Sequence, residues 1–376
     1  MMSTSTHTTM STRFAEDTRD AAPDSARPGP RIALLLPGQG AQYPGMAAGL
    51  YDREPTFTAA MDEFFALLGR RGSAIRGDWL AEPPGERIHD TGIAQPLLFA
   101  IDYALALTAR SWGLHPIALL GHSAGEYAAA VLAGVMGFAE ATALLLDRLA
   151  VLEHAPAGGM YAVAADPDQV EPYLRTAGAG LDPADRAVVG AVNGPRQILV
   201  CGPREALAGV VAELDRAGFT CRAVKASHGF HSPSLQAACA RAVPLFASIG
   251  LQAPRTTLVS GYTAGVLSAP EAEDPGFWAL QPARPVLFGP ALDALLSQDP
   301  DILVEAGPGQ GLSALARRHP RVASGRVAVV SLQGRRPGPR AADRAALAAA
   351  VGQLLRALPE HSGLIRAQRA LDGTAV

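Results

Sequence analysis

The stretch Ile117-Ala-Leu-Leu-Gly-His-Ser-Ala-Gly-Glu126 decides the fold of this chain. Its first four residues form a continuous apolar run, which is typical of a strand buried on both faces of a parallel sheet. The alanine-rich stretch 126–135 that follows favours a helix. The Gly-x-Ser-x-Gly pattern therefore lies in the turn between a strand and a helix, where glycines permit close backbone approach. Ser123 is predicted to be exposed at a helix N-terminus, where free N–H groups favour a developing oxyanion.

Further strands and helices extend this unit. Residues 31–36 form a second buried run, which a tight loop at Pro37-Gly-Gln-Gly40 stops. Residues 302–304 and 327–332 are predicted to be further strands of the large domain. Helical spacing predicts helices over 95–111 and 139–153 beside the sheet and a terminal amphipathic helix over 341–358.

The composition changes near Ala155-Pro-Ala-Gly-Gly159, where strand-like runs begin to alternate with helical runs. This spacing predicts a small inserted α+β unit over 156–225, within a large domain of residues 31–155 and 226–358. Residues 1–30 are predicted to be disordered and 359–376 to be a frayed tail. The strand-like runs are 160–164, 187–192, 197–200 and 221–224, and the helical runs are 166–177 and 204–217.

Composition excludes several classes of protein. The 376 residues are 48% hydrophobic and 18% charged, which is too apolar for a mainly disordered chain. The net charge of −3 supplies no field for nucleic acid. The three cysteines, in no paired spacing, predict buried thiols rather than a disulfide framework or a metal site. We find neither a run of about 18 uncharged apolar residues nor a signal-peptide core, so we expect a cytoplasmic protein with no membrane span.

A serine nucleophile needs a base, and nine histidines are available. His231 is the best candidate, because it opens a Ser-Pro turn at the start of a helix and can project into a cleft. His122 directly precedes Ser123. Neighbouring side chains in extended backbone point to opposite sides, so we expect His122 to point away from Ser123 and to be packed. His228 is predicted to be a pocket wall.

Several motifs together resemble those of the malonyl-CoA:acyl carrier protein transacylases and the acyltransferase domains of polyketide synthases. They occur in the family's order over roughly residues 31–357, and the absence of a flanking ketosynthase or carrier domain leads us to expect a freestanding acyltransferase. The resemblance implies a large α/β-hydrolase-like domain with a mostly parallel sheet and a small ferredoxin-like α+β subdomain. The motifs are Pro37 to Gln42, Gln95-Pro96, Gly121 to Glu126, Arg148, Asn193-Gly194-Pro195, His228 to Ser232, Pro285-Val286 and Glu305 to Gly309.

The resemblance also implies roles for individual residues. Ser123 would be acylated, and His231 would act as general base and then as general acid. The family orients this histidine by a backbone carbonyl, which falls on Gln281, so no acidic third member is expected. The N–H groups of Gln39 and Ala124 would form the oxyanion hole.

The acyl pocket is expected to include Gln95, His122, Asn193 and Arg148, together with His228 and Phe230. The arginine lies where the family pairs a guanidinium with the free carboxylate of a malonyl-type group. Malonyl-selective members usually have His-Ala-Phe-His, whereas this chain has His228-Gly-Phe-His231. Phe230 keeps the bulk that excludes an α-methyl branch, while Gly229 either loosens the loop or widens the pocket.

We therefore expect an acyltransferase of polyketide or fatty-acid biosynthesis that moves a malonyl-type group from CoA or a carrier to an acyl carrier protein. It would need no cofactor and no metal, bind no nucleic acid and act as a monomer. Arg317, Arg318 and Arg321 are a candidate positive rim for an acidic carrier. The alternatives are an aminoacyl or dipeptidyl transferase acting between carriers, an α/β-hydrolase thioesterase, and a silent docking module.

Overall fold

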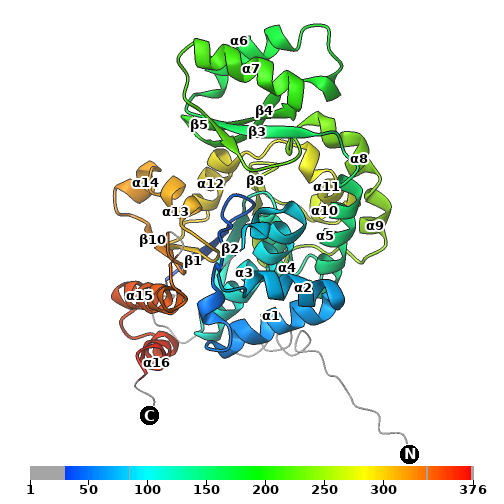
Figure 1. The fold of residues 1–376 in the computed structure, drawn as a ribbon. Helices are drawn as coiled ribbons and strands as arrows, with labels where there is room; N and C mark the ends of the chain where they lie inside the picture. The colour runs from blue at the N-terminus through cyan, green and yellow to red at the C-terminus, as the bar shows by residue number, and fades with distance from the viewer. Residues whose placement is uncertain (1–29, 84, 336–337, 374–376) are drawn as a thin grey trace, which may run out of the picture.

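The computed structural model describes residues 30–83, 85–335 and 338–373, so the predicted disordered segment lies outside the described residues except for its last position. A six-stranded sheet in the order β10-β9-β1-β2-β7-β8 forms the centre of the large domain (Figure 1). Neighbouring strands from β10 to β7 pair in parallel, and the edge strand β8 is antiparallel. The strands are β1 (Ile32–Leu36), β2 (Pro116–Gly121), β7 (Thr257–Ser260), β8 (Gly265–Val266), β9 (Ile302–Glu305) and β10 (Ala328–Ser331). The predicted α/β fold with a mostly parallel sheet is confirmed.

Both faces of this sheet are covered by helices, as the continuous apolar runs require. Along β1, Leu34 and Leu36 pack into one core with α1, α3 and α4, whereas Ala33 and Leu35 pack into a second core with α12 and α13. This alternation is the period of two expected of a strand. The helices of the large domain are α1 (Pro55–Leu68), α2 (Arg70–Trp79), α3 (Thr91–Ser111), α4 (Gly125–Ala133), α5 (Phe138–Leu152), α8 (Gln236–Ala240), α9 (Val243–Ala247), α10 (Ala269–Ala272), α11 (Pro275–Ala279), α12 (Phe288–Leu296), α13 (Gly311–Ala316), α14 (Pro320–Ala323), α15 (Ala341–Ala357) and α16 (Ser362–Leu371).

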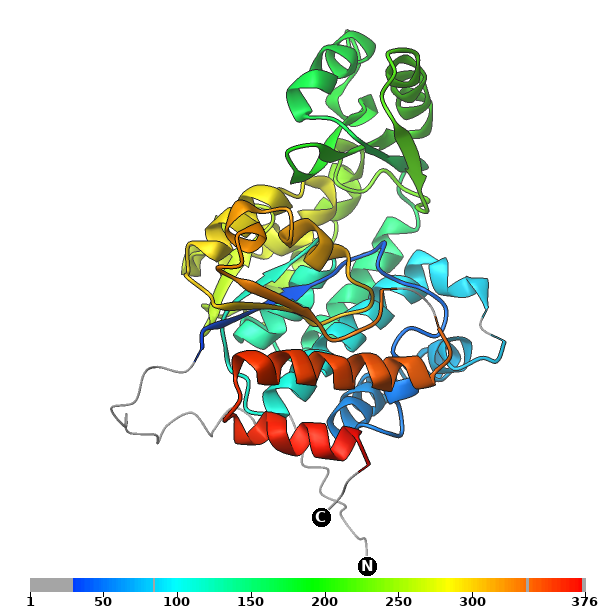
Figure 2. The ribbon, with the colours of Figure 1, turned by 90° about the vertical axis from the view of Figure 1, so that its left-hand side faces the viewer.

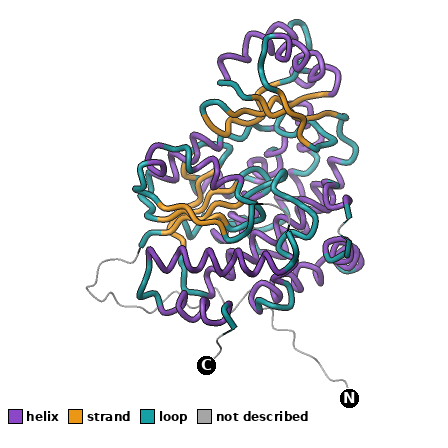
Figure 3. The backbone as a smooth tube through the Cα atoms, turned by 60° about the vertical axis from the view of Figure 1, so that its left-hand side comes forward, coloured by secondary structure: helices purple, strands orange, loops and turns teal. Residues whose placement is uncertain are grey.

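A second sheet, antiparallel and four-stranded, lies in a smaller subdomain above the first (Figures 1 and 3). Its elements follow the order βαββαβ and its strands the order β4-β5-β3-β6, which is a ferredoxin-like arrangement. A separate core that includes Val163, Val200 and Leu207 holds its two helices against the sheet. The elements are β3 (Gly158–Val163), α6 (Pro167–Ala177), β4 (Val188–Gly194), β5 (Gln197–Pro203), α7 (Arg204–Arg216) and β6 (Cys221–Val224).

The C-terminal segment differs from the expected frayed tail. Residues 362–371 form helix α16, which lies beside α15 (Figure 2). Leu364 is fully buried, and Gly363 lies so close to the Trp112 carbonyl that a Cβ there would clash at 1.7 Å. The reason is a short apolar stripe at Leu364, Ala367 and Leu371, whose spacing places all three on one helix face.

Two smaller expectations concern a membrane span and the cysteines. Helix α3 is long and apolar enough to pass for a membrane span, but 83% of its most apolar window is buried inside the protein, as a core helix requires. Cys201 and Cys239 are buried as predicted, whereas Cys221 is only partly buried on the short strand β6.

Candidate active site

Ser123 occupies the sharp turn between β2 and α4. Its φ of 52° is a left-handed value that is uncommon for a residue with a side chain. The flanking glycines have no room for a Cβ, which would lie 2.3 Å from the Glu126 backbone at Gly121 and 2.2 Å from the Leu36 carbonyl at Gly125. Positions 121 and 125 therefore require glycine, because the turn packs closely against β1 and against the first turn of α4.

His231 lies against this serine. Its Nε2 accepts a hydrogen bond from Ser123 Oγ at 2.8 Å, and its Nδ1 donates to the carbonyl of Arg284 at 3.1 Å. The carbonyl can only accept, so it assigns the proton to Nδ1 and leaves Nε2 free to act as a base. Burial, reinforced by the neighbouring His122, lowers the pKa of His231 to about 4. The imidazole is therefore neutral near pH 7.

The carbonyl that orients His231 is not the expected one. We expected Gln281, but the hydrogen bond from Nδ1 goes to Arg284, the residue directly before Pro285. The Gln281 carbonyl contributes less, by raising the pKa of His231, and the Pro282 carbonyl accepts the backbone N–H of His231 at 2.6 Å. The turn at residues 281–284 thus presents three carbonyls to one histidine, and no carboxylate takes part.

The predicted oxyanion donors, Gln39 and Ala124, come from the loop after β1 and the turn after β2. Gly38 brings the two together, because a Cβ there would lie 2.2 Å from the His122 carbonyl and 3.2 Å from the Ala124 nitrogen. Within the described part of the chain, no hydrogen bond uses the backbone N–H of Gln39 or of Ala124. Both groups are thus available to a ligand, and their role in an oxyanion hole stays a prediction.

Arg148 is buried on α5 beside the same centre, with 3% of its surface exposed. Its guanidinium lies 4.3 Å from the centre of the Tyr127 ring and donates to Gln95 Oε1 at 3.2 Å. Gln95 in turn donates to Gln39 Oε1 at 2.8 Å. The ion pairs found among the described residues do not include Arg148, and its Nε has no hydrogen-bond partner there. A buried cation without an anion fits a negatively charged ligand.

His122 points away from the reacting pair. Its Nε2 lies 2.8 Å from Asn193 Oδ1, and its ring contacts Phe288 at 5.4 Å between centroids. Burial lowers the pKa of His122. The predicted pocket residue Asn193 therefore contacts the side chain of His122 and not the reacting pair.

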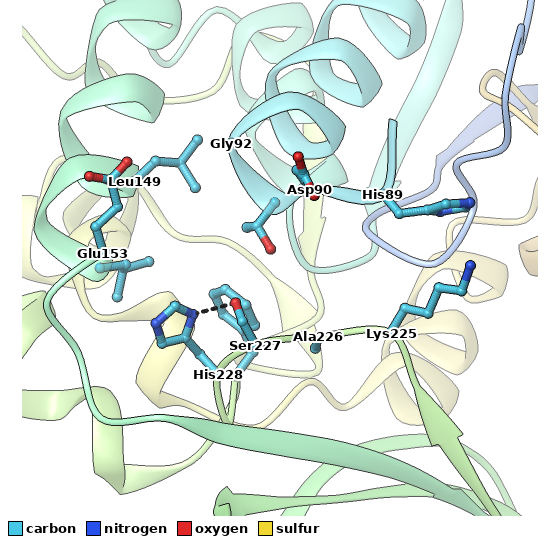
Figure 4. Close-up of a pocket in the computed structure, with 12 residues that line it drawn as sticks. His89, Asp90, Gly92, Leu149, Glu153, Lys225, Ala226, Ser227 and His228 are labelled. Atoms are coloured by element: carbon cyan, nitrogen blue, oxygen red, sulfur yellow. Dashed lines mark hydrogen bonds between the residues drawn. The ribbon is translucent and has the colours of Figure 1, made fainter. Parts of the chain in front are cut away.

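A cavity of about 450 Å³ lies next to this centre, where the chain returns from the small subdomain (Figure 4). His228 and Phe230 both line it, with their rings 5.9 Å apart and edge to face. Leu149 on α5 and Asp90 and Gly92 at the start of α3 form other walls. Gly229 does not face this space, because a Cβ there would lie 2.6 Å from the Gly202 carbonyl on β5. Gly229 therefore lets the loop approach the small subdomain and does not widen the pocket.

The candidate carrier rim is only partly a cluster of free cations. Arg317 and Arg318 are exposed, and Arg318 donates to Gln197 Oε1 on β5 at 3.0 Å. Arg321 is instead half-buried, forms an ion pair with Asp299 at 2.7 Å and donates to the Leu296 carbonyl. Arg321 is therefore paired within the large domain and does not belong to a free rim.

Two side chains at the site were not identified from the sequence. Glu126 is fully buried and accepts hydrogen bonds from Ser260 Oγ at 2.6 Å, Gly261 N at 2.9 Å and Gln281 Nε2 at 3.4 Å. Burial raises the pKa of Glu126 to about 8. Its signal was present, as an acidic residue inside an alanine-rich buried helix. Tyr262, which lies 6.1 Å from His231 between ring centroids, had no local signal.

Comparison with known proteins gives the family. The model of the "Acyl transferase domain" family matches residues 34–354. One subunit of the phenolphthiocerol/phthiocerol polyketide synthase of Mycobacterium tuberculosis is 35% identical over 306 residues, which are 81% of this chain and 20% of that protein. Polyketide synthase GfsA of Streptomyces halstedii is 34% identical over 87% of this chain and 4% of its own length. The chain thus spans a fifth or less of these relatives.

Solved structures of acyl transferases are similar to this chain, in agreement with the family match. The acyl transferase domain of SpnD, in complex with 2-(pent-4-yn-1-yl)malonyl, has a TM-score of 0.80 and 33% identity, covering 92% of this chain and 80% of that one. MCAT from Streptococcus pneumoniae has a TM-score of 0.72 and 25% identity, covering 87% and 99%. Enzymes of this family use no cofactor and act on acyl-CoA and acyl carrier protein. In the described residues no group of three or more His, Cys, Asp or Glu could hold a metal ion. The chain belongs to the acyl transferase domain family and is an acyltransferase.

Proposed function

We propose that this acyltransferase moves a malonyl-type group from a thioester, through an ester on Ser123, to the phosphopantetheine thiol of an acyl carrier protein in polyketide or fatty-acid biosynthesis. The observation that carries the proposal is the buried guanidinium of Arg148, which has no carboxylate partner among the described residues and is linked to Ser123's neighbourhood through Gln95 and Gln39. A free carboxylate on the acyl group would supply the missing anion. The substituted malonyl group bound by the SpnD domain supports this class of substrate.

In the first half-reaction, Ser123 Oγ attacks the thioester carbon while His231 Nε2 takes its proton. The N–H groups of Gln39 and Ala124 would stabilise the negative charge on the carbonyl oxygen. The C–S bond then breaks, and the leaving thiolate receives the proton from His231. The result is an acyl ester on Ser123 and a free thiol.

The second half-reaction reverses these steps with a different thiol. The phosphopantetheine thiol gives its proton to His231 and attacks the ester carbon. The C–O bond breaks, and Ser123 Oγ recovers its proton from the imidazolium. The cavity beside His228 and Phe230 is the approach that we assign to the pantetheine arm.

Two features separate this proposal from a hydrolase. His231 is oriented by a carbonyl, where the hydrolase alternative requires an acidic residue. The base is also His231, near the middle of the chain, whereas a hydrolase of this type has its histidine late in the sequence. We further propose that the enzyme works as a monomer in the cytoplasm.

Intact-mass spectrometry after incubation with a panel of acyl-CoAs and acyl carriers tests the proposal. Wild type should gain the mass of a malonyl group, and Ser123→Ala should gain none. His231→Ala should slow loading by about 10² to 10⁴, the contribution of a general base. Hydrolysis to water should be much slower than transfer to a carrier.

Substitution of Arg148 tests the nature of the acyl group. Arg148→Ala should nearly abolish malonyl loading while acetyl loading stays the same or improves, since only the carboxylate loses its partner. Phe230→Ser should in parallel admit methylmalonyl, because it removes the aromatic wall next to the base. A wild-type enzyme that ignores malonyl-CoA and accepts an uncharged aminoacyl or dipeptidyl carrier would disprove the carboxylate role.

A further inference from the structure

Glu126 lies three residues after Ser123, in the first turn of α4. Its backbone N–H donates to the Ser123 carbonyl at 3.0 Å, and Gly121 packs so closely that a Cβ there would lie 2.3 Å from the Glu126 Cα. The hydrogen bonds found in the described part of the chain join its carboxylate to neither Ser123 nor His231. Its backbone is therefore fixed to the nucleophile's turn, while its side chain extends elsewhere.

The segment of residues 281–287 carries the carbonyls that hold His231. The Arg284 carbonyl accepts from Nδ1 at 3.1 Å, and the Pro282 carbonyl accepts from the His231 backbone N–H at 2.6 Å. The segment begins with the short 3-10 turn Gln281–Ala283 and then continues outside any helix or named strand. Irregular backbone has few hydrogen bonds of its own, so contacts with other elements must fix these carbonyls.

Both ends of this segment are hydrogen-bonded to Glu126, directly or through one peptide group. At the start, Gln281 Nε2 donates to Glu126 Oε1 at 3.4 Å. At the end, the Leu287 N–H donates to the Gly261 carbonyl at 2.6 Å, and the Gly261 N–H donates to Glu126 Oε2 at 2.9 Å. Ser260 Oγ, at 2.6 Å from Oε1, holds the carboxylate against the end of β7. One carboxylate therefore joins both ends of the segment to the nucleophile's helix.

We propose that Glu126 is a positioning residue, whose carboxylate holds the segment 281–287 in place relative to the nucleophile's turn. Placed in this way, the Arg284 carbonyl keeps the proton of His231 on Nδ1. Nε2 is then free and directed at Ser123 Oγ, as a base requires. The acid thus acts on the base through the segment and exchanges no proton with it. The inference rests on the proposed roles of Ser123 and His231.

Two substitutions by methionine test the role of this carboxylate. Glu126→Met removes both carboxylate oxygens and keeps the length of the side chain, whereas Gln281→Met removes only the contact at the start of the segment. In both variants Val286 keeps its backbone hydrogen bonds with Gly190 and Val192 on β4. We therefore expect the segment to loosen without unfolding.

The first readout is the rate at which a small alkyl fluorophosphonate, which reacts with activated serines, labels Ser123. We expect Glu126→Met to be labelled about tenfold more slowly than wild type, less than the roughly hundredfold loss that a 1 Å misplacement causes. Gln281→Met should have a smaller effect. In the Glu126→Met background it should have none, since the contact that it removes is already absent. A further loss of rate in the double variant would overturn the link between the two side chains.

The second readout is the ring Nδ1–H signal of His231 in the NMR spectrum of protein labelled with ¹⁵N-histidine, assigned by its loss in His231→Ala. Wild type should show one neutral tautomer with the proton on Nδ1, whereas in Glu126→Met the proton should distribute over both ring nitrogens. The matched control is Glu305→Met, at another fully buried carboxylate, whose hydrogen bonds among the described residues go to the start of α13. It should lower the melting temperature and leave the His231 signal unchanged, because a loss of stability alone does not move the proton.

The outcomes separate this inference from the proposed function. An unchanged His231 signal in Glu126→Met overturns the positioning role, whether labelling is slow or normal and even if malonyl loading is normal. If Glu126→Met fails to fold, the signal of Gln281→Met decides in the same way. Slow labelling with a redistributed proton supports the role even if wild type fails to load malonyl-CoA, in which case only the proposed substrate is wrong. A wild-type protein that the probe does not label overturns the proposed function and this inference together.

Discussion

In the proposed mechanism, His231 is the residue whose protonation state controls both half-reactions. Its pKa is lowered to about 4 by burial, so the base is neutral at all higher pH values and is lost as the pH falls through 4. We expect the single-turnover rate of malonyl loading to be level between about pH 5.5 and 8 with respect to this group and to fall about tenfold per pH unit below 4. Rapid-quench measurements, with the folded state monitored by circular dichroism at each pH, would check this. A midpoint near 6.5, with the fold intact, would contradict the assignment.

At the scale of residues, the sequence predicts side-chain chemistry better than backbone chemistry. Ser123 and His231 carry signatures in their motifs, and the structure places them 2.8 Å apart. The carbonyl of Arg284 carries no such signature, because every residue has one, so the orienting group was expected three positions too early. Tyr262 was missed because its position depends on the pairing of β7 with distant strands.

At the scale of elements, the loop of residues 228–231 connects the small subdomain to the base. Gly229→Ala would place a Cβ 2.6 Å from the Gly202 carbonyl, so either the loop or β5 must shift. We expect a lower melting temperature and slower acyl loading, because the shift reaches His231 two residues later. The ratio of malonyl to methylmalonyl loading should stay constant, since the new methyl group does not face the pocket.

Gly209→Ala is the matched control for this substitution. Gly209 is exposed inside α7, and a Cβ there has nothing within 4 Å. Alanine favours the helix by roughly 0.5–1 kcal/mol, so the variant should be as stable as wild type or more so and equally active. A change of acyl selectivity in Gly229→Ala would show that position 229 does border the pocket.

Buried apolar runs predicted the inner strands well, because a strand covered on both faces has no polar positions. The run at 31–36 became β1 and the run at 117–120 became the greater part of β2. Helix α16 was missed because its apolar stripe is only three residues long and is interrupted by arginine and glutamine. Such a stripe forms a stable helix only when it packs against other elements, here α15 and the Trp112 carbonyl at the end of α3.

At the scale of the whole molecule, α16 should contribute to stability. Leu364→Ala leaves a cavity at a fully buried position and should lower the free energy of unfolding by about 2–5 kcal/mol. Urea denaturation followed by tryptophan fluorescence would measure this. The control is Arg366→Ala on the exposed side of the same helix, which should change stability by less than about 0.5 kcal/mol. Equal stability of the two variants would mean that α16 is detached in solution.

The proposed surface for an acidic carrier lies where the large domain contacts the small subdomain. Arg317 and Arg318 are exposed, and Arg318 contacts Gln197 of the small subdomain. Changing both to glutamate should raise KM for the carrier and leave loading from acyl-CoA unchanged. The control changes Arg356 on α15 and Arg366 on α16 to glutamate, which is an equal total charge change at two other exposed arginines. A carrier KM that is unchanged and independent of salt would exclude this surface.

The parallel pairing of β1 with β2 has a consequence for how the enzyme matures. The two strands are neighbours in space, yet β1 ends at Leu36 and β2 begins at Pro116. Gln39 and Ser123 can therefore meet only after a long loop has closed, and His231 must come from a still later part of the chain. Closure of long loops is the slow part of folding, whereas helices form early. We therefore expect a chain that is still folding to contain helices before it contains an activated serine, and to consume no thioesters until the large domain is complete.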